Sequence, residues 1–395
     1  MGRIKSIFKS PLFILYWIVA SELIGFGMII PVLPQIVTRF QTSGVAIGVL
    51  LASYSLVQFF AAPILGSLSD TYGRKPILVL SKVGSMCGYL IFAVASSYGL
   101  LLLSRIVDGL SGGNISVARA YAADVTGTEE RSKGMAVVGI GFATGFIIGP
   151  ALGGFLYGAQ TGFLLPGLVA AGLSLASAIL TILFLPESNT RTTTEPVLAR
   201  FSALPKFFSS RLISTILFIQ LGYMVVFSGF ETSISVFMQR AFSFTEQHTS
   251  MMFLYLGILA LLFQGYFSRK KVGNVQVMIV SGLGIGMLSF VGIAAARHIP
   301  GLLAALALLS IAICLVNVFL PAYFSSQVDP DSRGLAMGVF ESIGSISRVI
   351  GPILVYFAFF HHLRLAYILF ALVFGIASIV FCLLSFQKVS QTLRN

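Results

Sequence analysis

Four carboxylic acids lie inside long apolar stretches of the chain, where they could bind and release protons. Glu22, Glu231 and Glu341 stand in three different stretches, and Asp108 stands in a fourth. Burial disfavours the charged form of a carboxylic acid, so such a group can take up a proton on one side of a barrier and release it on the other. When ionised, it can also attract a cationic ligand. For each acid the alternative is a neutral ion pair with a structural role.

Two of these acids have an arginine at helical spacing. Arg105 precedes Asp108 by three residues, so the two side chains share one helix face and can neutralise each other. Whether they couple a proton or only pair stays open. Arg348 follows Glu341 by seven residues, and this spacing predicts a pair in which Glu341 is structural. The other two glutamates therefore rank first as proton carriers.

A run that reads GSLSDTYGRK, beginning at Gly66, combines glycine, acid and base between two apolar stretches. Gly66 allows two helices to approach closely, and Gly73 permits a tight reversal of the chain. Asp70 and Arg74 are four residues apart and can pair, with Asp124 as a candidate third partner. These charges predict a latch that holds one arrangement of the helices and releases in another. The alternative is a basic loop that only sets orientation.

A second run, GFIIGPALGG, lies in the middle of another apolar stretch. Gly145, Gly149, Gly153 and Gly154 place small residues on one helix face, and Pro150 predicts a kink. A face of this kind lets helices from the two halves of a protein pack backbone to backbone and slide. The alternative is ordinary packing of small residues.

Helices that cross a membrane must position these groups. The chain of 395 residues is 57% hydrophobic and only 10% charged, with a mean hydropathy of +0.96, so it has too few charges to cover a soluble domain. A helix needs about 20 apolar residues to cross the hydrocarbon. Twelve stretches qualify: 11–33, 45–67, 76–96, 99–122, 134–157, 163–185, 211–237, 248–268, 275–296, 301–323, 335–360 and 363–386.

Membrane orientation explains the net charge of +12 better than a nucleic-acid partner does. With the N-terminus in the cytoplasm, 18 of the 25 Lys and Arg fall in cytoplasmic loops and tails, four fall outside, and three (Arg105, Arg119 and Arg348) fall within spans. This asymmetry predicts that both termini are cytoplasmic. We expect Arg119 to reach the cytoplasmic headgroups. The first stretch lacks a cleavage site and is expected to be a span rather than a signal peptide.

The chain repeats itself with an offset of 202 residues. Arg131 precedes a Gly-Pro pair at 149–150 by eighteen residues, and Arg333 precedes another at 351–352 by the same distance. Two parallel repeats related by an axis along the membrane normal are one way to build a transporter. The predicted organisation is a six-helix bundle over residues 1–185, a polar cytoplasmic linker over 186–210, and a second six-helix bundle over 211–395.

Both runs resemble signature motifs of the major facilitator superfamily. The positions that match Gly66, Asp70, Gly73 and Arg74 help to lock the outward-open state in that superfamily, and the resemblance implies the same role here. The run from Gly145 resembles the motif of the superfamily's proton-driven exporters, which its sugar importers largely lack.

Shorter segments add to this resemblance. Arg105 and Gly109 resemble an Arg-x-x-x-Gly motif whose arginine is associated with proton coupling. The segment around Glu22 resembles the first span of tetracycline exporters, and that around Glu231 resembles a span of quinolone exporters in which the matching acid is tied to proton coupling. Those quinolone exporters carry a second acid where this chain has Asn317.

Aromatic side chains could line a substrate cavity. Stacking and cation–π contacts would suit flat, lipophilic cations. The alternative is that these side chains face lipid, as aromatic side chains often do in a membrane bundle. The candidates are Phe26, Tyr54, Tyr223, Phe227 and Phe230, with Asn317 as a polar member.

We expect no enzyme activity, cofactor or metal. Nothing resembles the GxxxxGK[S/T] phosphate loop, so ATP is not expected to drive transport. His361 and His362 are adjacent, so they point apart on a helix, and no third ligand lies nearby in the sequence. Cys87, Cys314 and Cys382 stand in apolar segments and are expected to be unpaired packing residues.

The resemblance covers essentially the whole chain and is to the drug/proton antiporter-1 group, near tetracycline and quinolone exporters. It implies an all-α membrane protein with twelve transmembrane helices in two pseudo-symmetric six-helix bundles. It also implies a monomer in the inner (plasma) membrane that exchanges protons for small lipophilic or cationic organic compounds by alternating access. Export of one endogenous metabolite, siderophore or lipid stays open, as does a non-transporting membrane sensor.

Overall fold

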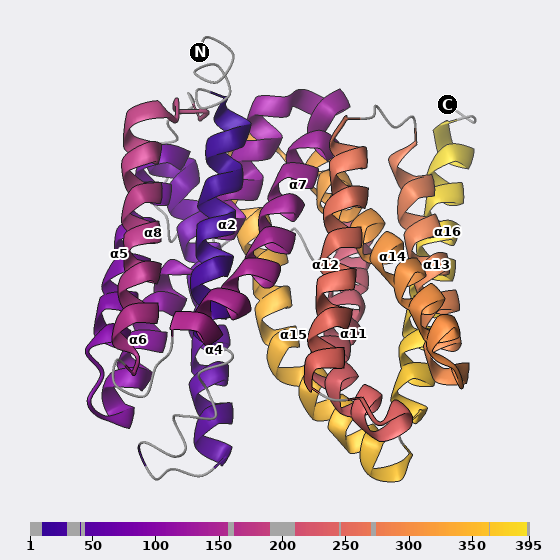
Figure 1. Cartoon of the computed structure of the whole chain (residues 1–395). Coiled ribbons are helices and arrows are strands. Elements are labelled where there is room, and N and C mark those ends of the chain that lie inside the picture. Colours follow the sequence, from indigo (N-terminus) through magenta and orange to yellow (C-terminus); the bar gives the residue numbers. More distant parts are fainter. Residues whose placement is uncertain are drawn as a thin grey trace, which may run out of the picture. The chain divides into compact units, whose positions relative to one another are not determined.

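The computed structural model describes residues 10–29, 40, 44–156, 162–189, 210–244, 246–269, 274–362 and 364–392. These residues form twelve α-helices and one 3-10 helix (Figure 1). Contacts divide the chain into two compact units. The first unit is Met1–Ser202 with Val328–Ser345, and the second is Ala203–Gln327 with Ile346–Asn395. The linker predicted at 186–210 stays a prediction, because residues 190–209 lie outside the described part.

The first unit contains the N-terminal helices and the start of one C-terminal helix. Within it α2 packs against α7 and α8, and α5 packs against α6 and α8. Its elements are α2 (Pro11–Ile29), α4 (Gly44–Tyr72), α5 (Arg74–Ala93), α6 (Tyr98–Ser111), α7 (Asn114–Leu156), α8 (Leu164–Phe184), η3 (Pro330–Ser332) and the beginning of α15 (Arg333–His361).

Helix α7 combines two predicted spans. Gly112 and Gly113 end α6 inside the stretch 99–122, because consecutive glycines are poor helix formers. From Asn114 the helix continues for 43 residues, but it doubles back on itself. A Cβ on Gly134 would lie 3.1 Å from the carbonyl oxygen of Ala122, whereas residues twelve apart in a straight helix are about 18 Å apart. The helix therefore consists of two antiparallel arms, and it continues through residues 123–133, which separate the two predicted spans.

The second unit is built from the remaining helices. Within it α13 packs against α14 and α16, α12 packs against α14, and α11 packs against α16. Its elements are α11 (Arg211–Phe242), α12 (Glu246–Arg269), α13 (Val275–Ala295), α14 (Ile299–Ser326), the later part of α15, and α16 (Leu365–Thr392).

The internal repeat is visible in the packing of each unit. In the first, a Cβ on Gly149 would lie 2.9 Å from the Cα of Gly27. In the second, a Cβ on Gly351 would lie 2.8 Å from the backbone nitrogen of Gly229. Adding 202 to each residue number of the first contact gives the residue numbers of the second. The two units therefore use one packing scheme, as the sequence spacing predicts.

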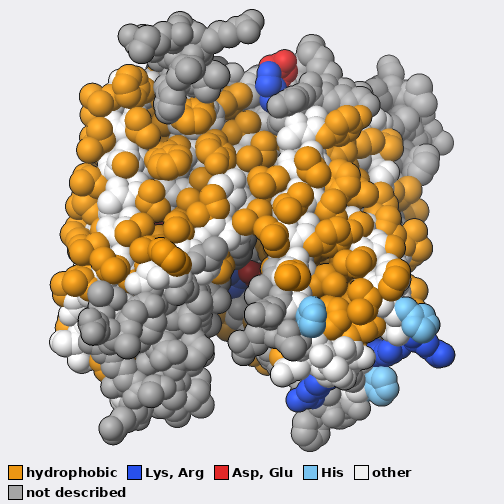
Figure 2. Space-filling view, in the orientation of Figure 1, with side chains coloured by type: hydrophobic (Ala, Val, Ile, Leu, Met, Phe, Trp, Pro, Cys, Tyr) orange, Lys and Arg blue, Asp and Glu red, His pale blue; other side chains and the backbone are white. Residues whose placement is uncertain are grey.

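The described surface is largely apolar. Nine helices in the described residues are long and apolar enough to cross a membrane. Among the coloured side chains in Figure 2 the hydrophobic ones predominate, and the most prominent charged ones lie toward its upper and lower ends, with further charged atoms in shadow near the middle. Large side chains such as Phe155, Phe218 and Phe357 are 87%, 72% and 68% exposed, which would be unfavourable in water. The chain is a multi-pass membrane protein.

Candidate functional site

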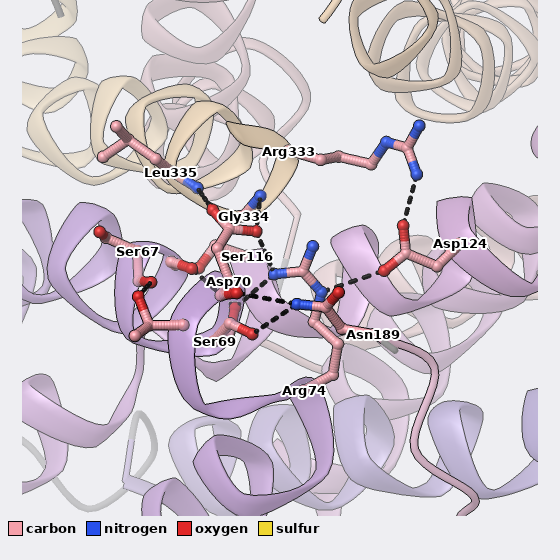
Figure 3. Close-up of polar contacts among 12 residues, drawn as sticks. Ser67, Ser69, Asp70, Arg74, Ser116, Asp124, Asn189, Arg333, Gly334 and Leu335 are labelled. Carbon is pink, nitrogen blue, oxygen red and sulfur yellow. Dashed lines mark hydrogen bonds and ion pairs between the residues drawn. The ribbon is translucent and has the colours of Figure 1, made fainter. Parts of the chain in front are cut away.

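The predicted latch is assembled around the end of α4 and the start of α15 (Figure 3). Asp70 accepts hydrogen bonds from the backbone nitrogens of Gly334 and Leu335, at 2.8 and 2.9 Å. It also pairs with Arg74 Nη1 at 2.6 Å. One carboxylate thus satisfies the free N–H groups of a helix N-terminus and neutralises a buried guanidinium. Burial raises the pKa of the Asp70 carboxyl, while Arg74 and the two amides act against that rise.

A second carboxylate extends the cluster. Asp124 in α7 accepts from Arg74 Nε at 3.0 Å, and its other oxygen pairs with Arg333 at the start of α15. Ser69 accepts from Arg74 Nη1 at 2.7 Å. The sequence predicted the contacts among Asp70, Arg74 and Asp124. It missed Arg333, although the repeat had singled that residue out.

Glycines permit this close approach. A Cβ on Gly66 would overlap the carbonyl oxygen of Gly334, and the reverse holds for a Cβ on Gly334 and the carbonyl of Gly66. Gly73 has a φ of +98°, a conformation that favours glycine. Behind it, Glu187 accepts from the backbone nitrogens of Arg74 and Lys75 at 2.9 and 3.0 Å, which caps α5. The capping role of Glu187 was also missed.

A deeper group of polar side chains surrounds Glu22 in the first unit. The ammonium of Lys82 lies 2.7 Å from Glu22 Oε2, and Asn114 Nδ2 donates to the same oxygen at 2.9 Å. Ser85 Oγ lies 3.2 Å from each carboxylate oxygen. Lys82 also donates to Ser21 at 3.1 Å. All five side chains are fully buried.

The pair of Arg105 and Asp108 lies beside this group. Arg105 Nη1 is 3.2 Å from Asp108 Oδ2 on α6, as the three-residue spacing predicts. The guanidinium also lies over the rings of Tyr89 and Phe92, at 5.7 and 5.3 Å. Asp108 interacts electrostatically with Glu22 as well. The two ion pairs therefore belong to one charged interior.

Two expectations about basic residues are wrong. Lys82 was counted with the cytoplasmic charges, yet it lies inside α5 with no exposed surface. Arg119 was expected at the headgroups, but it is 4% exposed and pairs with Glu341 at 2.9 Å. Glu341 therefore has Arg119 rather than Arg348 as its ion-pair partner. The sequence did contain a signal for Lys82: it is a lone lysine in an apolar stretch, and a buried cation needs a partner.

Glu231 in α11 differs from the other embedded acids. It is partly exposed, and no ion pair or hydrogen bond to its side chain is found among the described residues. Arg348 is the charged group that acts on it electrostatically. Asn317, in α14, is also partly exposed. A carboxylate without an ion pair is free to exchange a proton without leaving a buried cation behind.

The glycine strip of α7 packs against α2. A Cβ on Gly145 would overlap Leu23, one on Gly149 would lie 2.8 Å from the carbonyl oxygen of Ile24, and one on Gly153 would overlap Met28. These nearest neighbours all belong to α2 of the same unit, and the contact of this face with the opposite half stays a prediction. Pro150 and Gly154 lie in the same helix.

The predicted cavity aromatics fall into separate units. In the first, the rings of Phe26 and Tyr54 are 5.1 Å apart. In the second, Tyr223 stacks on Phe227 at 6.2 Å. Phe230 packs edge-on against Phe290, and Tyr223 contacts Phe374. Tyr223 and Phe230 are 1% and 4% exposed, so both are core residues of their unit. Their role in substrate binding stays a prediction.

Known proteins resemble this chain in sequence and in fold. The family model of the Major Facilitator Superfamily matches residues 15–352 and 248–395. The tetracycline resistance protein, class H, of Pasteurella multocida is 31% identical over 381 residues, which cover 91% of each chain. Multidrug resistance protein 2 of Bacillus subtilis is 29% identical over 84% of each chain.

A second group of relatives is eukaryotic. Major facilitator superfamily domain-containing protein 10 of Mus musculus is 28% identical over 78% of this chain and 71% of its own length. The crystal structure of the human organic anion transporter MFSD10 (TETRAN) matches with a TM-score of 0.83 over 94% of this chain and 98% of that one, at 23% identity, and so shows the fold alone. The helical architecture, the repeated packing and these matches together show that the chain is a transporter of the major facilitator superfamily.

Proposed function

We propose that the chain exports small organic compounds in exchange for protons, by alternating access. Each proton that enters releases about 2.3 kcal/mol per 100 mV of membrane potential, which can drive a solute outward. The proposal places both termini in the cytoplasm. This placement agrees with the excess of basic residues in the loops and tails that are predicted to be cytoplasmic. The resistance proteins among the relatives favour export, since their names describe resistance to tetracycline and other drugs.

Glu231 carries this proposal. Glu22, Asp108 and Glu341 each face a basic side chain at 2.7 to 3.2 Å, so their charges are already compensated. Glu231 has no such contact among the described residues, and Arg348 is the charged group that acts on it electrostatically. A proton can therefore load and leave Glu231 at a lower cost than at the ion-paired acids.

The Asp70 cluster supports the alternating part of the mechanism. Its contacts are polar and interdependent: Asp70 binds Arg74 and two amides, and Asp124 bridges Arg74 and Arg333. A cluster of this kind is stable when complete and costly when partly broken. It can therefore hold the start of α15 in one state and release it as a unit in another.

Proton flux in proteoliposomes tests the proposal. The purified chain is reconstituted with an internal pH-sensitive dye, a proton gradient is imposed, and a panel of tetracyclines and aromatic amines and acids is added. We expect at least one compound to accelerate proton movement. Glu231→Gln should abolish that response, whereas Glu130→Gln, which alters a surface acid that is 45% exposed, should not.

Two outcomes would refute the proposal. One is solute movement that persists at the same rate after the electrochemical gradient has been collapsed. The other is an unchanged proton response in Glu231→Gln. Because the amide is close in shape to the acid, and the carboxylate makes no ion pair among the described residues, the variant is expected to fold.

A further inference from the structure

We propose that the donors around Glu22 form a binding site for the carboxylate of an organic anion, which Glu22 itself occupies when no ligand is bound. The inference rests on the proposed transport function and names a substrate class for it. The sequence had suggested lipophilic or cationic compounds instead.

The donors converge as they would on a bound anion. Lys82, Asn114 and Ser85 come from α5 and α7, and all three donate to one carboxylate at 2.7, 2.9 and 3.2 Å. A charged donor combined with neutral ones is the usual way to bind a carboxylate in an apolar interior. A free carboxylate has the same two oxygens as the Glu22 side chain, so it can make the same contacts.

Unused polar groups next to the site add to this interpretation. Arg105 Nη2 is buried and has no hydrogen-bond partner among the described residues. The side-chain oxygen of Asn114 is likewise buried and accepts no hydrogen bond from the described residues. Tyr89, whose hydroxyl lies near Gly25, interacts electrostatically with both Glu22 and Arg105. Buried groups without partners are rare, and one explanation is that a ligand or water satisfies them in another state.

Charge balance dictates how the ligand enters. Glu22 interacts with Lys82 and Tyr89 from α5, with Asp108 from α6 and with the uncharged Asn114 from α7, while α8 carries no charged residue. Arg105 joins this group through its ion pair with Asp108. These two cations and two carboxylates already sum to zero. An added anion therefore enters with a proton, which Glu22 accepts as it gives Lys82 up to the ligand. Glu231 remains the carrier of the counter-transported proton.

Access to the site must be conformational. Glu22, Lys82 and Asn114 have no exposed surface, and Arg105 is 2% exposed. A ligand can reach them only when the helices of the first unit open toward one side of the membrane. This is the behaviour that alternating access requires of a substrate site.

Three probes with the same ring system test the charge preference. Binding of 1-naphthoate, 1-naphthamide and 1-naphthylmethylammonium to the purified full-length chain is measured by isothermal titration calorimetry in detergent. We expect the carboxylate to bind at least about tenfold more tightly than the amide, since a hydrogen bond to a charged group is worth that much. Repeating the titration in buffers of different ionisation enthalpy should show uptake of about one proton with the carboxylate and none with the amide.

Variants locate the effect. Glu22→Gln should abolish the proton uptake and strengthen naphthoate binding. Lys82→Gln should remove the tenfold preference, whereas Lys133→Gln, a surface lysine that is 47% exposed, should preserve it. Since Lys82→Gln leaves Glu22 unpaired, the charge-balanced Glu22→Gln/Lys82→Gln variant provides the decisive comparison: it should fold and bind the carboxylate and the amide alike.

The outcomes separate this inference from the proposed function. Equal affinity for naphthoate and naphthamide in the unmodified chain, or a preference that survives in the double variant, would overturn the carboxylate site. If the ammonium or the amide still accelerates proton flux in proteoliposomes, the transport function stands without that site. If naphthoate binds as expected while no compound moves protons, the site stands and proton-coupled export fails.

Discussion

The two units share a packing scheme but differ in what fills their interiors. The first contains three buried ion pairs, Glu22–Lys82, Arg105–Asp108 and Arg119–Glu341, in addition to the Asp70 cluster. The described interior of the second is dominated by rings, such as Phe290 against Phe370 and Phe374. The same helix packing therefore encloses ion pairs in the first unit and mainly aromatic side chains in the second.

This contrast has an energetic consequence. In the first unit each charge depends on its partner, and removal of one partner leaves the other unpaired in a low-dielectric interior. In the second unit Glu231 has no ion pair among the described residues, so a change in its charge breaks no ion pair there. We therefore expect substitutions of charged residues to disturb stability in the first unit and coupling in the second.

Arg119→Met should have the largest effect on stability, because it leaves Glu341 unpaired. We expect a loss of about 3–5 kcal/mol, measured as a lower midpoint of thermal unfolding in detergent. Arg119→Met/Glu341→Met removes both charges and should recover most of that loss. Glu231→Gln should leave the midpoint nearly unchanged. Equal losses in the single and double Arg119 variants would contradict the contrast between the units.

Gly66→Ala should weaken the contact between α4 and α15. The added methyl group meets the carbonyl of Gly334, which is backbone and cannot move aside. A cost of about 1–3 kcal/mol would shift the conformational equilibrium roughly 5–150-fold. In a background without native cysteines, faster maleimide labelling of Leu335→Cys, a position that is 1% exposed, would report this shift. Gly172→Ala, where a Cβ meets nothing within 4 Å, is the control and should label at the original rate.

Gly149→Ala and Gly351→Ala compare the two units directly. A Cβ would lie 2.8 Å from a carbonyl oxygen of α2 in the first case and 2.5 Å from one of α11 in the second. We expect similar destabilisation, about 1–3 kcal/mol each, in thermal unfolding. A large effect at one position and none at the other would show that the repeat is preserved in geometry but not in energetics.

Glu187→Ala should have the smallest effect. It removes the acceptor for the first two N–H groups of α5 and should cost about 0.5–2 kcal/mol of stability. The midpoint of thermal unfolding is measured for Glu187→Ala and for the control Glu130→Ala, since the ion pair of Glu130 with Lys133 at 3.7 Å is exposed. A midpoint no lower than that of Glu130→Ala would argue against the capping role.

Much of the fold could be predicted because its signals are local. The Gly-Pro pairs at 149–150 and 351–352, with their common offset, predict the packing seen at Gly27 and Gly229. The spacing of Arg105 and Asp108 predicts their pair because one helix carries both residues. Helix α7 was not predicted as one element, since hydropathy marks apolar stretches and says nothing of the turn that joins them.

Partners on different helices could not be predicted in the same way. Sequence spacing pairs Glu341 with Arg348, whereas the structure pairs it with Arg119, which lies 222 residues away. Lys82 and Glu22 are 60 residues apart, and Asp124 and Arg333 are 209 apart. Contacts of this kind depend on which helix faces meet, and that is a property of the assembled bundle.

The sequence by itself determined that this is a membrane-embedded helical protein with an internal repeat, because apolar length, charge asymmetry and spacing are properties of the chain. Only the tertiary structure decided which embedded acids are neutralised and which makes no ion pair within the part of the chain that the structure describes. The physical reason is that the protonation and reach of a buried carboxylate depend on the charges within a few ångströms of it, and in this protein most of those charges belong to other helices.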